Sequence, residues 1–213
     1  NQVPLFNGGT EDDLSEFNKS LIKLNYKSEN KKYIAAGIYT FAIKNTAIFF
    51  DVGEPPKKIF SRSYQSGPLA FEYYLDGKKI ITNCGFGSNI SSKAELLSRL
   101  TSAQSTLTLN DTSVTKFERN KLINNVFGNS IKNTFKTYDL NINKERKFIS
   151  CSVTHNGYEK KFGCTHKREL FFDRENNYLK GSDHIFKEKD GIPLRYIFRF
   201  HINPKLSVVK TMS

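Results

Sequence analysis

Apolar residues near the start of the chain recur every three or four positions. The segment opens with Thr10 and Asp13, which form a capping box. The apolar positions that follow are Leu14, Phe17, Leu21 and Leu24. This spacing places their side chains on one face and predicts a helix over 11–24. We expect that face to cover an edge or a face of a β-sheet.

From residue 33 onward the pattern changes to short runs rich in β-branched and aromatic residues. The first four runs cover 39–44, 47–52, 69–75 and 79–84. Asn45 separates the first pair, which Gly53-Glu54-Pro55-Pro56 closes, and Asp76-Gly77 separates the second pair. Asp-Gly suits the positive φ angles of a tight two-residue turn, so the sequence predicts two β-hairpins.

The middle of the chain is more mixed. Ser92 with Glu95 forms a second capping box and predicts a short helix to about residue 100. The alternation at 105–109 predicts a strand, whereas 110–130 is the least patterned part of the chain.

Strand patterns dominate the C-terminal part. They cover 134–140, 146–155, 163–173, 178–187 and 194–202, and a last run at 206–212 could add another. The turns between them are predicted at Asn156-Gly157, Glu175-Asn176-Asn177 and Asp190-Gly191. Short strands at regular spacing, with no linker and no internal repeat, predict an all-β fold. We expect one antiparallel β-sandwich over 1–213 with a short N-terminal helix.

Composition narrows the class of protein. Of the 213 residues 38% are hydrophobic and 25% charged, which excludes collagen-like and wholly disordered chains. No apolar run approaches the roughly 18 residues of a membrane-spanning helix, so we expect no membrane partner. The first residues, 1–7, are no signal peptide, and the absence of an initiator Met indicates a fragment or a processed chain.

The net charge of +12 favours a polyanionic partner, either nucleic acid or an acidic polysaccharide. The excess is spread along the chain, as it would be on any solvated basic surface. Charge alone therefore identifies no ligand.

Cysteine and histidine spacing gives no metal or disulfide framework. Cys84, Cys151 and Cys164 form no CxxC pair, so buried free thiols are expected, although a Cys151–Cys164 bridge between antiparallel neighbours would be compatible with an oxidising compartment. The histidines lie in or at the ends of predicted strands, which favours structural roles; they are His155, His166, His184 and His201. Phosphate-loop, zincin and G-x-S-x-G signatures are absent from the sequence.

Ordered motifs along nearly the whole chain resemble the C-terminal β-sandwich domain of heparinase II/III-like polysaccharide lyases. The motifs are Leu5-Phe6-Asn7-Gly8, Phe50-Asp51-Val52-Gly53-Glu54-Pro55-Pro56, Gly67-Pro68-Leu69-Ala70-Phe71-Glu72, Ile81-Thr82-Asn83-Cys84-Gly85, Arg99-Leu100-Thr101-Ser102-Ala103-Gln104-Ser105-Thr106-Leu107, His155-Asn156-Gly157-Tyr158, His166-Lys167-Arg168 and Arg199-Phe200-His201. The segment that starts at Arg99 is similar to the family's Arg-Ser-Thr-Arg-Ala-His-Asn-Thr-Leu.

The resemblance implies a longer parent chain. In this family an N-terminal α/α toroid precedes the sandwich, and the cleft between them cleaves uronic-acid polysaccharides by β-elimination. That reaction needs a neutralised carboxylate, a base and a proton donor, commonly Tyr and His. The resemblance further implies a bacterial, periplasmic protein acting on a substrate such as a glycosaminoglycan, with a cytoplasmic location as the alternative.

The resemblance also implies which residues the sandwich contributes, and all of them differ here. The family's catalytic His falls on Ser63, and its three metal positions fall on Gln65, Asn83 and Gln104. Neutral amides are poor zinc ligands, so we expect no zinc and no other cofactor. The three amides could instead hydrogen-bond one another in place of the metal.

Three neighbouring side chains are further candidates for ligand contact. Arg62 and Arg99 could bind carboxylate or sulfate, and Tyr64 could stack on a sugar or act as acid or base. The alternatives are a solvated loop charge for Arg62, a helix C-terminal cation for Arg99 and a packing aromatic for Tyr64.

These observations predict the C-terminal domain of a protein that binds or cleaves acidic polysaccharide. The chain alone is expected to be inactive, because half of the cleft would come from the toroid. A catalytically degenerate carbohydrate-binding or structural domain is the main alternative, so enzymatic activity of the parent stays open. A nucleic-acid-binding β domain is less favoured, and it would cluster aromatic residues with Lys and Arg on an exposed sheet face.

Overall fold

The computed structural model describes residues 4–9, 15–26, 33–43, 45–120, 122–124, 128–188 and 194–209. Its strands are β1 (Ile34–Ala35), β2 (Ile38–Ile43), β3 (Thr46–Asp51), β4 (Phe71–Leu75), β5 (Lys78–Thr82), β6 (Leu107–Leu109), β7 (Thr137–Lys144), β8 (Phe148–Tyr158), β9 (Cys164–Asp173), β10 (Tyr178–Lys187), β11 (Tyr196–Phe198) and β12 (His201–Ile202). Its α-helices are α1 (Ser15–Lys23), α2 (Ser92–Ser98) and α4 (Glu159–Phe162), and its 3₁₀ turns are η1 (Lys58–Phe60), η2 (Gly87–Asn89) and η3 (Thr101–Ala103).

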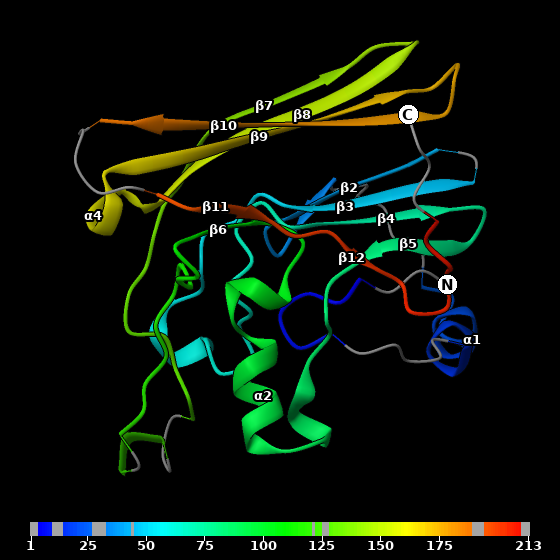
Figure 1. The fold of residues 1–213 in the computed structure, drawn as a ribbon. Helices are drawn as coiled ribbons and strands as arrows, with labels where there is room; N and C mark the ends of the chain where they lie inside the picture. Colours follow the sequence, from blue (N-terminus) through cyan, green and yellow to red (C-terminus); the bar gives the residue numbers. More distant parts are fainter. Residues whose placement is uncertain are drawn as a thin grey trace.

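The strands form two stacked antiparallel sheets, which confirms the predicted sandwich. One sheet has the order β1-β2-β3-β4-β5-β12, the other has the order β10-β9-β8-β7, and β11 pairs with β6 in a small third sheet. In Figure 1 the four-stranded sheet lies above the six-stranded one, and α2 lies below both. The loops around α2 therefore gather at one side of the sandwich.

The main core lies between the two sheets. Alternate residues of each strand point inward, so Phe41 and Phe50 from one sheet face Val153, Leu170 and Phe172 from the other. The rings of Phe41 and Phe172 lie 6.1 Å apart between their centroids. The alternation of the sequence places these large side chains between the sheets, and their burial is what mainly holds the sheets together.

Both predicted hairpins are confirmed. β2 pairs with β3, and β4 pairs with β5. Asp76 and Gly77 have φ angles of 50° and 72°, as the Asp-Gly signature requires. Asn177, in the predicted turn between β9 and β10, also has a positive φ, of 52°.

The C-terminal strands differ from the prediction in several places. Asn156-Gly157 is no turn, because β8 continues to Tyr158 through a register shift and α4 makes the reversal. A Cβ on Gly157 would lie 2.3 Å from Val114 Cγ1, so glycine is there for close packing rather than for a turn. The strand expected at 134–140 begins only at Thr137, as β7.

The strand expected at 194–202 is divided, because its two parts pair with strands of different sheets. β11 pairs with β6, and β12 pairs with β5. Residues 206–209 form no strand, and 210–212 lie outside the described residues, as does the Asp190-Gly191 turn.

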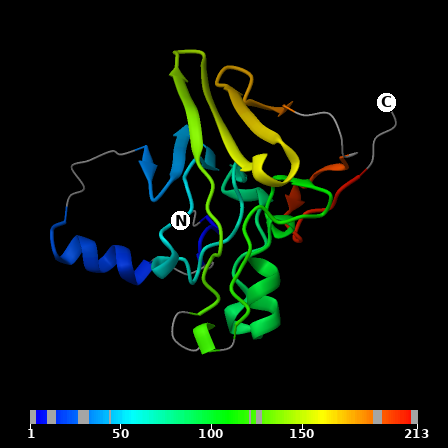
Figure 2. The same ribbon diagram turned by 90° about the vertical axis from the view of Figure 1, so that its left-hand side faces the viewer.

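The two helices also need correction. No residue of α1 is buried, and Figure 2 shows α1 standing apart from the sheets, so the expectation that it covers a sheet is wrong. Amphipathic spacing shows that one face is apolar but not what that face contacts. The Thr10–Asp13 capping box lies outside the described residues. For α2 the cap is Ser91 rather than Ser92, because Ser91 Oγ accepts the hydrogen bond from Ala94 N–H at 3.1 Å.

The cysteines form no bridge. All three are free, Cys84 exposed and the other two buried. Cys151 lies opposite Leu170 and Cys164 lies opposite Tyr158, so they stand at different ends of the β8–β9 pair, roughly 20 Å apart at about 3.3 Å per residue. No helix among the described residues has the length and apolar character needed to cross a bilayer.

Candidate functional site

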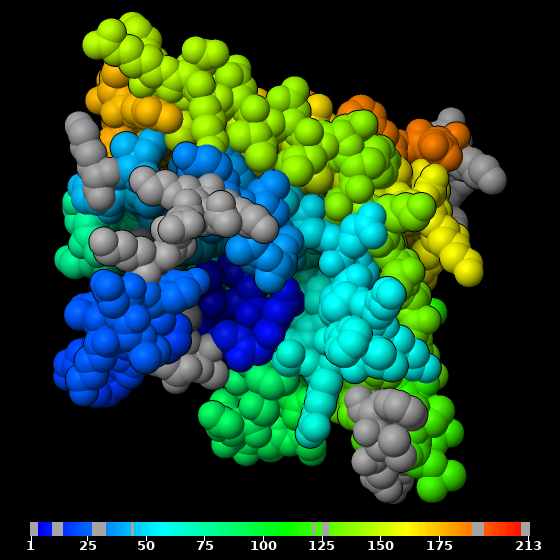
Figure 3. Space-filling model, turned by 180° about the vertical axis from the view of Figure 1, so that it is seen from behind, coloured from blue at the N-terminus to red at the C-terminus, as the bar shows by residue number. Residues whose placement is uncertain are grey.

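A cavity of about 460 Å³ opens beside the position of the family's catalytic histidine. Its lining includes Asn7, Gly37, Gly53, Phe60, Ser63 and Tyr64. Figure 3 shows the hollow, with residues near 7 at its base and the segments around 37 and 53–64 at its rim. Three segments that are distant in sequence therefore meet at this site.

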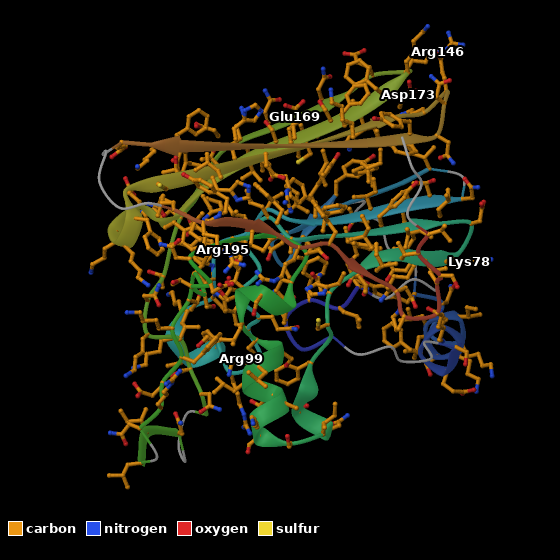
Figure 4. The ribbon with its side chains drawn as sticks, in the orientation of Figure 1. Lys78, Arg99, Arg146, Glu169, Asp173 and Arg195 are labelled. Atoms are coloured by element: carbon orange, nitrogen blue, oxygen red, sulfur yellow. The ribbon has the colours of Figure 1, made fainter. Side chains whose placement is uncertain are left out.

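Arg99 is buried behind Tyr64 of the cavity wall rather than facing a ligand. Its side chain is completely buried, Nε donates to the Tyr64 carbonyl at 2.8 Å, and Nη2 donates to the Ser61 carbonyl at 2.7 Å. The guanidinium also stacks 4.2 Å from the centroid of the Phe117 ring. Burial lowers the pKa of Arg99 to about 10, which leaves it charged at neutral pH. Arg99 is the C-cap residue of α2, and Figure 4 shows it beside that helix.

Tyr64 is a packing aromatic in this structure. Only 4% of it is exposed, and it belongs to a second core cluster with Leu107, Phe117 and Tyr158. Burial, together with the carboxyl of Asp51, raises the pKa of the Tyr64 phenol well above its ordinary value. The phenol is therefore protonated at neutral pH and cannot serve as a resting base.

Asp51 is a titratable group that sequence reasoning missed. It lies at the end of β3, two residues before Gly53 of the cavity wall, and its Oδ1 accepts a hydrogen bond from Gly53 N–H at 3.1 Å. Burial raises the pKa of Asp51 to about 7, and the hydrogen bond from Gly53 opposes this shift. The carboxyl is therefore partly protonated near neutral pH.

The residues at the three metal positions, Gln65, Asn83 and Gln104, are each at most 2% exposed, and we call them the amide cluster. Gln65 Nε2 donates to the Gly85 and Ser98 carbonyls, at 2.6 and 3.2 Å. Gln104 Nε2 donates to the same Ser98 carbonyl at 2.8 Å. The two glutamines are thus joined through a shared acceptor.

Asn83 belongs to a separate set of bonds. Its Oδ1 accepts from Ser105 N–H at 2.8 Å, and its backbone N–H donates to Glu72 Oε1 at 2.9 Å. Glu72 is fully buried and lies 3.5 Å from Lys79 Nζ. The expectation that the three amides bond one another directly is therefore wrong in its detail, since each is held by backbone groups.

The amide cluster does not fit a zinc ion. Zinc favours thiolate, imidazole or carboxylate ligands, whereas the oxygens of Gln65 and Asn83 already accept hydrogen bonds from the N–H groups of Gly8 and Ser105. The absence of zinc in the protein remains a prediction.

The loop over residues 57–62, beside the cavity, is basic and aromatic, although the cavity lining itself also contains the exposed Glu54. Arg62 is exposed, as are Lys57, Lys58 and Phe60 on the preceding residues of the same loop. Sequence reasoning selected Arg62 but missed the others, although Lys-Lys-Ile-Phe directly after Pro55-Pro56 is a sign of an exposed loop. Ser63, which follows Arg62, offers a hydroxyl in place of an imidazole.

A second buried network lies between the sheets and was also missed. It consists of His155, His166, Arg168 and Asp183, and we call it the histidine network. Gly157 N–H donates to His155 Nδ1 at 3.0 Å, so the His155 proton lies on Nε2, which is 3.3 Å from His166 Nδ1. His166 Nε2 then donates to Asp183 Oδ1 at 2.7 Å. The hydrogen bonds therefore run in one direction, with both imidazoles neutral.

Arg168 connects this network to the opposite layer. Its Nε bonds Asp183 Oδ1 at 2.7 Å, while its Nη1 donates to the carbonyls of Leu69 and Ser105. Burial lowers the pKa of His155 well below its ordinary value and also lowers that of His166. The histidines predicted to be structural thus lie in strands, and these two are buried.

Comparison with known proteins agrees with this fold. The sequence model described as heparinase II/III-like, C-terminal, matches residues 27–213, so the chain belongs to the heparinase II/III-like family. The structure is similar to a heparan sulfate lyase HepC mutant from Pedobacter heparinus, with a TM-score of 0.63 and 19% identity over 87% of this chain and 30% of that one. It is also similar to heparinase III, with a TM-score of 0.60 and 14% identity over 90% of this chain and 31% of that one.

Among curated proteins, the FtsZ-localized protein C of Caulobacter vibrioides is 27% identical over 170 residues, which are 74% of this chain and 28% of that protein. The chain therefore spans less than a third of the length of each of these relatives.

Proposed function

We propose that this domain provides one wall of a binding cleft for an acidic polysaccharide in a longer heparinase II/III-like protein. The observation that carries the proposal is the exposed loop that leads into Ser63: Phe60 lines the cavity with Ser63, and Lys58 and Arg62 are exposed on the same loop. Cationic groups attract carboxylates and sulfates, and an exposed ring offers a stacking surface to a sugar. The net charge of +12 adds long-range attraction.

The domain alone would not carry out β-elimination. Ser63 has no imidazole, and the Tyr64 phenol is buried and protonated at neutral pH. An N-terminal α/α toroid in the parent would have to supply the base and the proton donor. The proposal places the parent in the periplasm of a bacterium, where such polysaccharides are accessible.

Binding of heparin and alginate oligomers to the isolated domain tests the proposal. We expect the double variant Lys58→Ser/Arg62→Ser to weaken binding roughly tenfold, because it removes two charged contacts at a partly exposed site. The matched control is Lys78→Ser/Arg146→Ser, which removes the same charges from exposed hairpin turns that Figure 4 shows far from α2. Equal losses in both variants would indicate nonspecific attraction and would contradict the proposed site.

A second candidate is a parent that binds without catalysis. It is supported by the replacement of all four family residues at Ser63, Gln65, Asn83 and Gln104, and by the similarity to a protein named for its localisation with FtsZ. Incubating the full parent with heparin, heparan sulfate and alginate, and following the absorbance of unsaturated uronate, separates the two candidates. Turnover would favour the lyase, and binding without turnover would favour the second candidate.

A further inference from the structure

A second cavity, of about 440 Å³, lies where β12 joins the six-stranded sheet. Its lining includes Leu5, Cys84, His201, Ile202, Pro204 and Lys205. Cys84 is exposed, whereas the other two cysteines of the chain are buried. The cavity therefore combines an accessible thiol, an imidazole and a cation with apolar walls.

The hydrogen bonds of His201 determine its tautomer. Nε2 lies 3.2 Å from the Ser102 carbonyl, which can only accept, so Nε2 carries the proton. Nδ1 then holds a lone pair, and it lies 3.8 Å from Cys84 Sγ. The backbone N–H of His201 donates to Ser105 Oγ at 3.0 Å and further fixes the residue. The thiol, the base and the group that orients the base are thus neighbours in space. This is the arrangement of an activated nucleophile.

The charge states suit general-base activation. Although Cys84 is accessible, partial desolvation by the atoms around it raises its pKa, so the resting sulfur is a thiol rather than a thiolate. Burial also lowers the pKa of His201, opposed by its hydrogen bond to Ser102, and the cation of Arg199 lowers it further. The imidazole is therefore neutral at neutral pH and able to accept a proton.

We propose that Cys84 is a modification site, at which His201 activates the thiol for reaction with a small disulfide that carries a carboxylate. The Cys84 proton passes to His201 Nδ1 as the sulfur attacks one sulfur of the disulfide. The S–S bond of the reagent breaks, a new disulfide to Cys84 forms, and the departing thiolate takes the proton from the imidazolium. Cys84 is oxidised to the disulfide level, and the other half of the reagent is reduced to a thiol.

The cavity walls favour this class of reagent. Lys205 is exposed at the cavity and can pair with a carboxylate, while Ile202 and Pro204 contact an apolar stem. Neither the cavity nor the Cys84–His201 pair depends on a polysaccharide, so this inference stands apart from the proposed function.

Oxidised glutathione is the test probe, and the cationic disulfide cystamine is its comparison. Mass spectrometry of the native protein should find one adduct, at Cys84, and none in Cys84→Ser. His201→Gln should slow the reaction at least about tenfold, as loss of a general base does. Lys205→Met should slow the reaction of Cys84 with oxidised glutathione about 2–5-fold, because it removes one exposed ion pair. It should not change the reaction with cystamine. Lys93→Met, on exposed α2, should change neither rate.

The pH profile separates activation from a structural role of His201. In the wild-type protein the rate should fall as His201 becomes protonated below its ordinary pKa, whereas in His201→Gln it should follow only the ionisation of the thiol. Rates measured in denaturant should be equal for both proteins. Identical pH profiles in the folded state, or equal reaction of Cys151 and Cys164, would overturn the proposal.

Discussion

The amide cluster and the histidine network are both buried and polar, but they use different chemistry. Gln65, Asn83 and Gln104 are neutral at every pH and bond mainly to backbone groups of loops. The histidine network bonds side chain to side chain and includes a guanidinium and a carboxylate. The amide cluster contains no ionisable group, whereas the histidine network contains four.

The difference separates what holds the loops from what holds the sheets. The amide cluster joins the segment around 65, which directly follows Ser63 and Tyr64 of the cavity, to the segments around 85 and 98. Arg168 instead extends from β9 to the carbonyls of Leu69 and Ser105 and so joins the layers. We therefore expect changes in the histidine network to alter global stability most, and changes in the amide cluster to act more locally.

The largest expected effect is that of Arg168→Ala. It removes the partner of a partly buried carboxylate, Asp183, and leaves two buried backbone carbonyls without their donor. The free energy of unfolding should fall by about 3–5 kcal/mol, measured by urea denaturation. The control Arg146→Ala, at an exposed turn, should change it by less than about 0.5 kcal/mol. A loss below about 1 kcal/mol for Arg168→Ala would show that the network does not hold the layers together.

The second expected effect is a loss of stability in acid. The lowered pKa values of His155 and His166 mean that the unfolded chain takes up protons below about pH 6.5 that the folded chain does not. The free energy of unfolding should therefore fall as pH drops through this range, by up to about 1.4 kcal/mol per histidine and pH unit.

Asp51 acts in the opposite direction. Its pKa, raised to about 7, contributes stability that is present below about pH 4 and is lost as pH rises through 7. The acid effect should thus be measured in an Asp51→Asn background, by urea denaturation at several pH values between 5 and 8. A flat profile there would contradict the neutral assignment of the imidazoles.

A smaller effect is expected within the amide cluster. Asn83→Ala leaves the buried Ser105 N–H without its acceptor and should cost about 1–3 kcal/mol. Gln104→Ala should cost less, about 0.5–1.5 kcal/mol, because Gln65 still donates to the Ser98 carbonyl. Thermal unfolding of the two variants shows which one loses more stability. A larger loss for Gln104→Ala would show that the bond from Gln65 to the Ser98 carbonyl does not compensate for the missing one.

The smallest expected effect is that of zinc. Purified protein should contain no stoichiometric zinc by elemental analysis, and added zinc should leave its melting temperature unchanged, because the amide cluster offers no good ligands. The triple variant Gln65→His/Asn83→Asp/Gln104→His provides the positive comparison. About one equivalent of zinc in the wild-type protein would refute the interpretation of the amides.

Sequence patterns predicted elements better than they predicted contacts. Alternation and turn residues located the hairpin at Asp76-Gly77 and the long strands β8, β9 and β10, because these signals are local. Exposure of α1 and burial of Arg99 depend on residues that are distant in sequence, which no local pattern reveals. The pairing of His155 with His166 needed the register of β8 on β9, and the bulge near Gly157 hides that register.

The family resemblance grouped residues that are far apart in sequence, because it compares the order of motifs along the chain rather than local periodicity. It placed Gln65, Asn83 and Gln104 near one another, and the structure joins two of them through Ser98. It did not indicate that Tyr64 would be buried, because the depth of a side chain depends on the loops packed over it.

The contact of residues 4–9 with Gln65 resembles a peptide bound to a receptor. Asn7 Oδ1 accepts from Gln65 N–H, and Gly8 N–H donates to Gln65 Oε1. This peptide is tethered through α1, which itself buries no residue, so its local concentration is set by the tether rather than by the amount of protein in solution. In the isolated domain, a protease cut within α1 would turn this intramolecular contact into a bimolecular one, which dilution weakens.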